Sequence, residues 1–400
     1  MAEPAERQRT VLRAPRVEFD LSALVLGMAG YFAYQLIWPA LASLLQVPDH
    51  KLFRSWDALR YEFFGRTLSF LNLPYSNFIA ERVGTRWPMV LPPEKAGEQA
   101  TIYVLGLPFW KLAVVGLALL VLWSIVAGAI SRVYAVRIAR DESIGATDGL
   151  AFSLSNLRAF LQAPLFVAAA AALFLVIAAA AGAGSAIPGA GPFLEIILYP
   201  LALVAGLVVV VIAVGGIFGL PIMQAALATE RNGTLDAISR TFSYVFTRPV
   251  AYLVAIVLVT VVAGVISAFG GAFIMVAFRA MQFGASWNAD PAASFDAVRG
   301  IELGAQASQI AGGMFSWPHI EKVEGLPLMW MYVSWAFTVL ALVVVNGYVL
   351  SYFVGGLTDT YFLLRREVDG IDDGEVYVEG AEATLGEPLA GEPTSAVDSK

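Results

Sequence analysis

The sequence predicts an all-α, polytopic membrane protein, a bundle of about six transmembrane helices joined by cytoplasmic amphipathic elbow helices. The first reason is composition: 58% of the 400 residues are hydrophobic and 14% are charged, against roughly 45–50% and 25% in ordinary globular chains. The second reason is six long apolar stretches, comparable to the ~20 residues that a helix needs to cross ~30 Å of hydrocarbon. They lack the alternation of polar and apolar residues found in membrane β-barrels, which favours helices.

The elements follow in order. Residues 1–20 form a polar, basic N-terminal segment, and residues 21–366 are assigned to the transmembrane domain. The first apolar stretch is longer than a signal-peptide core of about 7–15 residues, which favours a retained anchor over a cleaved signal. The six stretches are Leu21–Leu45, Ile102–Ser131, Phe160–Ala183, Phe193–Pro221, Val250–Ala277 and Leu328–Phe353.

Arginine residues predict the orientation. They gather in the N-terminal segment, after the second and fourth stretches, and directly after the last. Because cytoplasmic loops are enriched in Lys and Arg, both termini are expected in the cytoplasm. The external loops are then 46–100 and 278–327. Loop 46–100 carries seven basic residues but also six acidic ones, and long loops follow the rule less strictly.

Two polar segments predict the elbow helices. One begins at Asp148 and leads to Pro164, and the other begins at Asp236 and leads to Pro249. Each reads as a short amphipathic helix followed by a proline in the first turn of a membrane helix, where its missing N–H is harmless. Two spans separate the units, so the repeat keeps the same direction, as in some transporters and in duplicated hairpins.

This pattern, over Arg132–Pro249, resembles the repeat of several bacterial polytopic inner-membrane families of unknown function. It also resembles the membrane domain attached to some glycerophosphodiester phosphodiesterases. The resemblance implies the style of the fold and a bacterial inner membrane. It covers no phosphodiesterase catalytic domain, so it implies no catalytic residue.

The C-terminal segment 367–400 is predicted to be an acidic, disordered cytoplasmic tail. It carries ten acidic residues and one basic residue, so the net charge of −7 belongs to the tail and the rest of the chain is close to neutral. Such a composition buries too little apolar surface to offset the entropy of ordering. No basic patch of the kind that binds nucleic acid is present in the sequence.

Three residues are candidate intramembrane polar contacts, since an ionisable or strongly polar group is costly in the membrane. Lys111 either lies within the second span or, if the helix begins near Pro108, extends its ammonium outward from the first turn. Glu195 either caps the fourth span from its first turn or binds an ion. Asn346 either bonds a neighbouring helix or contacts a substrate.

The leading functional hypothesis is a non-enzymatic membrane scaffold or assembly factor. The chain has no cysteine and only two histidines, His50 and His319, and no catalytic, cofactor or metal motif is evident. The expected partners are the lipid bilayer and other proteins, contacted through the tail and the elbows. The alternative is a transporter or permease component for a small solute or lipid. Small residues four apart, such as Gly215 and Gly219, predict closely packed spans or, alternatively, a hinge or conduit.

Overall fold

The computed structural model describes residues 17–45, 103–104, 107–185, 187–230, 233–287, 326–371 and 374. Within these ranges the chain is almost entirely helical, which confirms the all-α prediction. The predicted external loop 46–100, most of the segment 278–327 and most of the tail 367–400 lie outside the described residues.

The described helices are α2 (Leu21–Leu44), α6 (Phe109–Arg140), α7 (Ala146–Ser155), α8 (Leu157–Ser185), α9 (Gly191–Glu230), α10 (Thr234–Thr247), α11 (Pro249–Ser286) and α13 (Leu326–Val368). Strands β1 (Tyr103–Val104) and β2 (Leu107–Pro108) pair antiparallel directly before α6. The apolar stretch from Ile102 is therefore not helical throughout. The helix begins only after Pro108, because the residue before a proline disfavours helical backbone angles.

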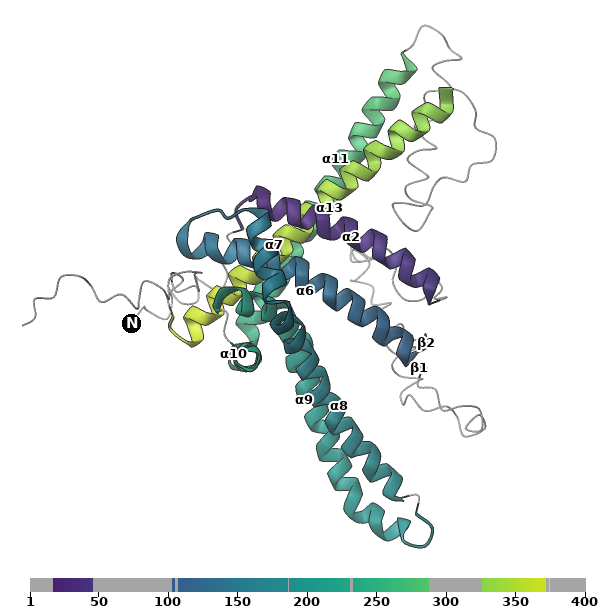
Figure 1. The fold of residues 1–400 in the computed structure, drawn as a ribbon, viewed down its shortest axis with the longest axis vertical. Coiled ribbons are helices and arrows are strands. Elements are labelled where there is room, and N and C mark those ends of the chain that lie inside the picture. The colour runs from purple at the N-terminus through teal and green to yellow at the C-terminus, as the bar shows by residue number, and fades with distance from the viewer. Residues whose placement is uncertain are drawn as a thin grey trace, which may run out of the picture.

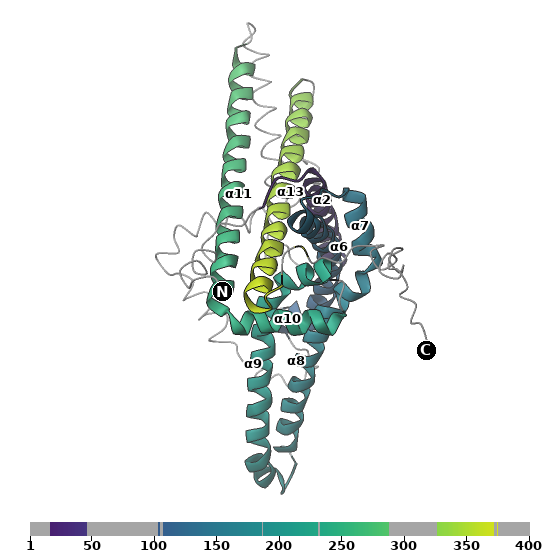
Figure 2. The ribbon, with the colours of Figure 1, turned by 90° about the vertical axis from the view of Figure 1, so that its left-hand side faces the viewer.

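The long helices form three hairpins that radiate from one region (Figure 1). This region is called the hub and consists of α7, α10 and the ends of the long helices that meet around them. The first hairpin pairs α2 with α6, the second pairs α8 with α9, and the third pairs α11 with α13. Figure 2 shows α8 and α9 extending from the hub in one direction and α11 and α13 in the opposite direction. The short helices α7 and α10 lie in the hub and connect successive hairpins, as the elbow prediction requires.

Five described helices contain stretches long and apolar enough to cross a membrane: Ala113–Arg140, Leu157–Gly184, Ile196–Glu230, Pro249–Met281 and Val339–Val368. The chain thus has the helices of a multi-pass membrane protein. The apolar stretch of α2, Leu21–Ile37, is shorter, so the sixth span remains a prediction. Helix α9 has 40 residues and α13 has 43; at 1.5 Å per residue each exceeds the ~30 Å hydrocarbon core about twofold.

The two elbow helices begin in the same way. Their N-cap residues, Gly145 and Gly233, have nearly equal backbone angles, φ −64° and ψ 152° against φ −59° and ψ 153°. Asp148 and Asp236 then lie in the first turns, where the positive end of the helix dipole favours a carboxylate.

The prolines of the two repeat units differ in position. Pro249 is the first residue of α11, as predicted. The prediction for Pro164 is wrong, because α7 ends at Ser155, α8 begins at Leu157, and this proline lies inside α8. A proline offers no N–H to the carbonyl four residues earlier, here that of Phe160. The Ser124 hydroxyl of α6 donates to that carbonyl oxygen at 3.4 Å.

A tyrosine hydroxyl of a neighbouring helix lies close to a second internal proline. Pro221 interrupts the hydrogen-bond ladder of α9. The hydroxyl of Tyr252, in α11, donates to the carbonyl oxygen of Phe218 three residues before the proline. The carbonyl that Pro221 leaves without an N–H donor is that of Ile217, four residues earlier. The Tyr252 hydroxyl therefore adds a second donor to the adjacent Phe218 carbonyl, whereas Ser124 satisfies the carbonyl that Pro164 leaves free.

Removing either hydroxyl is expected to destabilise the hub. Ser124→Ala should lower the free energy of unfolding by about 1–3 kcal/mol, the cost of leaving the buried Phe160 carbonyl unsatisfied. Tyr252→Phe should lower it by about 0.5–1.5 kcal/mol, the net contribution of one hydrogen bond. The measurement is thermal unfolding of the purified protein in detergent. Thr260→Val is the matched control, since the Thr260 hydroxyl bonds the Ile256 carbonyl of its own helix. Equal effects of all three substitutions would contradict the explanation.

Glycines set the closest helix crossings. A Cβ on Gly27 of α2 would lie 2.2 Å from the carbonyl oxygen of Gly347 in α13. Gly215 and Gly219 of α9, expected to pack against another span, instead contact the elbow α10. A Cβ on Gly215 would lie 2.4 Å from the Phe242 ring. The close approach predicted at Gly215 and Gly219 therefore occurs with an elbow as the partner, whereas the closer crossing at Gly27 and Gly347 was not predicted.

Candidate functional site

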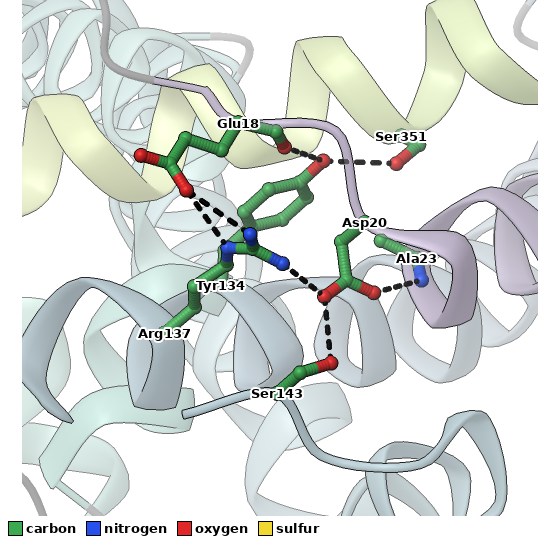
Figure 3. Close-up of polar contacts among 7 residues, drawn as sticks. All are labelled: Glu18, Asp20, Ala23, Tyr134, Arg137, Ser143 and Ser351. Atoms are coloured by element: carbon green, nitrogen blue, oxygen red, sulfur yellow. Dashed lines mark hydrogen bonds and ion pairs between the residues drawn. The ribbon is translucent and has the colours of Figure 1, made fainter. Parts of the chain in front are cut away.

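A polar cluster joins the residues just before α2 to α6 and to α13 (Figure 3). It is called the Asp20 cluster and consists of Glu18, Asp20, Tyr134, Arg137, Ser143 and Ser351. Asp20 is 3% exposed, and its Oδ1 accepts the backbone N–H of Ala23 at 3.0 Å, which caps α2. Its Oδ2 accepts hydrogen bonds from Arg137 at 2.7 Å and from the Ser143 hydroxyl at 2.9 Å.

Tyr134 connects this cluster to α13. Its hydroxyl lies 3.2 Å from the Ser351 hydroxyl and 3.4 Å from the Glu18 carbonyl oxygen. A Cβ on Gly355 would lie 2.7 Å from the Tyr134 ring. Arg137 also pairs with the Glu18 carboxylate at 3.0 Å. The N-terminal segment, α6 and α13 are therefore held together at one point.

The environment of Asp20 favours its charged form. Burial by itself raises the pKa of this carboxyl group. The Ala23 N–H, the Ser143 hydroxyl and the Arg137 guanidinium outweigh burial and hold the pKa of Asp20 below its usual value of 3.8. A carboxylate with a depressed pKa in the folded state stabilises the protein above the unfolded pKa, and the stabilisation is lost as the pH falls through the folded pKa.

Asp20→Asn is expected to show this dependence. Asparagine can still cap α2 but loses the charged hydrogen bonds, which should lower stability at neutral pH by about 1.5–3 kcal/mol. The gap between wild type and variant should stay constant down to about pH 4 and shrink below it. Chemical unfolding from pH 7 to pH 3 measures the gap, and a gap independent of pH would refute the charged role.

A second polar cluster joins the C-terminal ends of α9 and α13 to the elbow helix α10. It is called the Glu230 cluster and consists of Glu230, Asp236, Arg240, Tyr244, Tyr361, Arg365 and Asp369. The Glu230 side chain is 7% exposed. Its Oε1 accepts hydrogen bonds from the Tyr361 hydroxyl at 2.7 Å and from Arg240 at 2.8 Å, and the Arg365 Nε lies 2.9 Å away.

Helix α10 supplies the outer part of the Glu230 cluster. Arg240 pairs with Asp236 one turn earlier at 3.0 Å and reaches Asp369 at 3.7 Å. The Tyr244 hydroxyl donates to the Asp369 carboxylate. Burial lowers the pKa of Arg240, but the nearby Glu230 and Asp236 carboxylates outweigh it and raise the pKa. Burial and the bond to Asp369 raise the pKa of Tyr244. The arginine stays cationic and the phenol stays neutral.

Arg132 provides a third link. Its Nη1 donates to the Ala228 carbonyl oxygen at 3.1 Å, and its guanidinium lies 4.4 Å from the Phe152 ring centre. A buried guanidinium over an aromatic face is stabilised by the ring quadrupole. This single side chain of α6 therefore contacts both α7 and α9.

The polar groups of these clusters pair with one another and so connect helices. The carboxylates of Glu230, Asp236 and Asp369 are all engaged by arginine or tyrosine. In the part of the chain that the structure describes, no three His, Cys, Asp or Glu side chains are arranged to hold a metal ion. His50 and His319 lie outside the described residues.

The structure places Lys111 in the first turn of α6, which begins at Phe109. Its Nζ donates to the carbonyl oxygen of Leu45 at 2.6 Å and lies 5.6 Å from the Trp110 ring centre. The ammonium therefore satisfies a free carbonyl at the outer end of α2. This position agrees with the interpretation of Lys111 as a boundary residue.

The other two candidate residues, Glu195 and Asn346, lie in α9 and α13. Helix α9 begins at Gly191 and has no acidic residue in its first turn, so the expectation of Glu195 as a first-turn residue is wrong. The helix starts before Pro192, because proline is favoured near a helix start. Asn346 is fully buried in α13, and its amide donates to the Leu342 carbonyl of its own helix at 2.8 Å.

Sequence reasoning missed the residues of both clusters. Glu230, Arg365 and Arg137 stand at the ends of apolar runs, where they read as boundary charges. Only the fold shows that helices far apart in the chain bring their ends together. The one available signal was the presence of acidic and basic residues together at several helix ends.

No family model, no curated protein and no solved structure matches the chain.

Proposed function

We propose that this multi-pass protein is a non-enzymatic scaffold or assembly factor of a bacterial inner membrane, with the hub and both termini in the cytoplasm. The observation that carries the proposal is how little the hairpins pack outside the hub. Only 6% of the residues in an 18-residue apolar window of α8 are buried, against 50% in the corresponding window of α13. Apolar faces of this extent fit lipid or other membrane helices.

The hub supports the proposal because it holds the three hairpins by their inner ends. The Asp20 cluster joins the first hairpin to the third through Tyr134 and Ser351, and the Glu230 cluster joins the second to the third. Buried polar networks of this kind specify one arrangement of helices when their members are satisfied. A scaffold needs such a rigid centre from which separate binding faces extend.

The directions of the hairpins require a bend in one of them if both are to cross the same bilayer. Spans in one flat bilayer are tilted by about 0–40° from its normal, whereas α8–α9 and α11–α13 extend from the hub toward opposite ends of the molecule's long axis (Figures 1 and 2). For both hairpins to cross one bilayer, the second must turn at its base. That base contains Pro164 and Pro221, the residues at which membrane helices bend.

Photo-crosslinking in native membranes tests the scaffold function. A photoreactive residue at Leu173 or Val176, exposed by 60% and 64% on α8, should give defined protein adducts. Phe269 on α11, exposed by 75%, provides a comparison position on another hairpin. Adducts with lipid alone at all three positions would overturn the proposal.

The tail is tested separately, as a second contact surface. A truncation should end after Gly374, because Asp369 contacts Tyr244 and Arg240 in the Glu230 cluster. If the acidic tail recruits cytoplasmic partners, this shortened chain should lose their crosslinks and keep those made through α8.

The rival function is a transporter or permease component, favoured by the parallel repeat of elbow and hairpin. It predicts solute flux across liposomes containing the purified chain. Flux that Asn346→Leu abolishes, without protein adducts in native membranes, would replace the scaffold function by transport.

A further inference from the structure

The elbow helix α10 crosses α9 where the exposed apolar surface of α9 ends (Figure 2). The last large apolar side chains exposed on α9 are those of Ile217 and Phe218, and residues 222–229 are all buried in the hub. A Cβ on Gly219, between these two parts, would lie 2.7 Å from the Thr241 methyl group of α10. Helix α10 therefore lies at the boundary between the exposed part of α9 and its buried part.

A second exposed apolar surface begins directly after α10. Helix α11 starts at Pro249, and its residues Val250 and Leu253 are exposed by 72% and 46%. Both neighbours of α10 contain stretches that could cross a membrane, Ile196–Glu230 in α9 and Pro249–Met281 in α11. Exposed apolar surfaces of such helices fit lipid. Helix α10 thus connects two lipid-facing surfaces, at the depth where the chain enters or leaves the bilayer.

Helix α10 itself has an apolar face that the hub does not cover. Its apolar residues outside the buried face recur every three or four positions, the spacing of one helix face: Leu235, Ile238, Phe242 and Phe246. The side chain of Leu235 is 69% exposed and that of Phe246 is 48% exposed. Ser239 and Ser243, which are also exposed, give the helix a polar side next to this apolar face.

The apolar face of α10 is directed along α9, away from the hub. A Cβ on Gly215 would lie 2.4 Å from the Phe242 ring, whereas one on Gly219 meets Thr241. Because Gly215 lies about one turn further from the hub than Gly219, Phe242 reaches toward the exposed part of α9. The Phe246 ring centre lies 6.1 Å from that of Phe242. The apolar face of α10 is therefore continuous with the lipid-facing surface of α9.

We propose that α10 is an interfacial helix whose apolar face inserts into the bilayer leaflet nearest the hub. Leu235 and Phe246 lie about 5–10 Å into the boundary between headgroups and acyl chains, and Ser239 and Ser243 remain in water. The occupant of this face is lipid, because the face continues the surface of a membrane-crossing helix at the depth where that surface ends. This inference rests on the multi-pass architecture and does not depend on the scaffold function.

Spin labels on single cysteines test the insertion in the full chain, which has no cysteine of its own. Leu235→Cys and Phe246→Cys place the label on the apolar face. Ser239→Cys and Ser243→Cys are the matched controls, because both serines are exposed on the same helix. Leu207→Cys is the lipid reference, since Leu207 on α9 is 65% exposed.

The labelled variants are reconstituted alone into liposomes of phosphatidylcholine and phosphatidylglycerol. Electron paramagnetic resonance then measures how often each label collides with oxygen, which concentrates in hydrocarbon, and with a nickel complex, which stays in water. The oxygen-to-nickel ratio should be several-fold higher at positions 235 and 246 than at 239 and 243, and should approach the ratio at 207. Circular dichroism and a monodisperse elution profile confirm that the variants are folded.

Two results would overturn the interfacial helix. Ratios at 235 and 246 as low as those at the two serine positions would show that the apolar face lies in water. Labels at 235 and 246 that neither oxygen nor nickel reaches would show that protein covers the face, namely a second copy of this chain. Because the liposomes contain no other protein, neither result bears on the crosslinks through α8, and the two proposals can fail separately.

Discussion

Replacing Gly27 by alanine is expected to separate α2 from α13 and to cause the largest loss of stability of any single methyl addition in the hub. The new Cβ would lie 2.2 Å from the Gly347 carbonyl oxygen, and a backbone atom cannot move aside as a side chain can. Overpacking a tight core costs about 1–3 kcal/mol, and here the backbone of a whole helix must shift, so about 3 kcal/mol or more is expected.

Thermal unfolding in detergent micelles measures the effect of Gly27→Ala. Gly116→Ala is the control, because a Cβ at Gly116 meets no atom within 4 Å and alanine favours the helix by about 1 kcal/mol over glycine. The first variant should therefore melt at a lower temperature than wild type, and the control at an equal or higher one. Equal melting temperatures for Gly27→Ala and wild type would show that α2 does not pack on α13 in solution.

The second large effect is expected at Glu230. Glu230→Gln leaves the buried Arg365 guanidinium without its anionic partner at 2.9 Å, and removing one partner of a buried ion pair costs about 3–5 kcal/mol. Asp236→Asn is the matched control, because the Asp236 side chain is 44% exposed and surface pairs contribute about 0–1 kcal/mol.

A double-mutant cycle separates the pair from its surroundings. Arg365→Met alone should be as costly as Glu230→Gln, because the carboxylate then loses one of its two arginine partners. The double variant should recover part of the loss, since an uncharged pair needs no compensation. If the two single effects simply add, Glu230 and Arg365 do not act as a pair.

Together these clusters add polar contacts to the close packing that holds the three hairpins together at the hub. The third hairpin is central, because α13 contributes Ser351 to the Asp20 cluster and Tyr361 and Arg365 to the Glu230 cluster. Loosening either cluster should free one hairpin and leave the other attached. In the proposed scaffold, the hub would then set the spacing of the binding faces.

Much of the architecture followed from local patterns. Apolar runs of more than about 20 residues specify membrane helices because backbone polar groups must be satisfied within the helix. The polar segments beginning near Asp148 and Asp236 specified the elbows, and Pro249 specified a helix start. The helix ends were less predictable: α9 and α13 continue past the apolar runs, to Glu230 and Val368, because packing in the hub extends them.

The sequence by itself determined the helical class, the elbows and one position of close helix approach, at Gly215 and Gly219. The tertiary structure alone decided which helix ends meet, and with them the partners of Glu230, Asp20 and Arg132. A residue's distance along the chain says nothing about a contact such as that between Tyr361 and Glu230, 131 positions apart. Local propensity acts over a few residues, whereas ion pairing and close packing depend on where folding brings distant segments together.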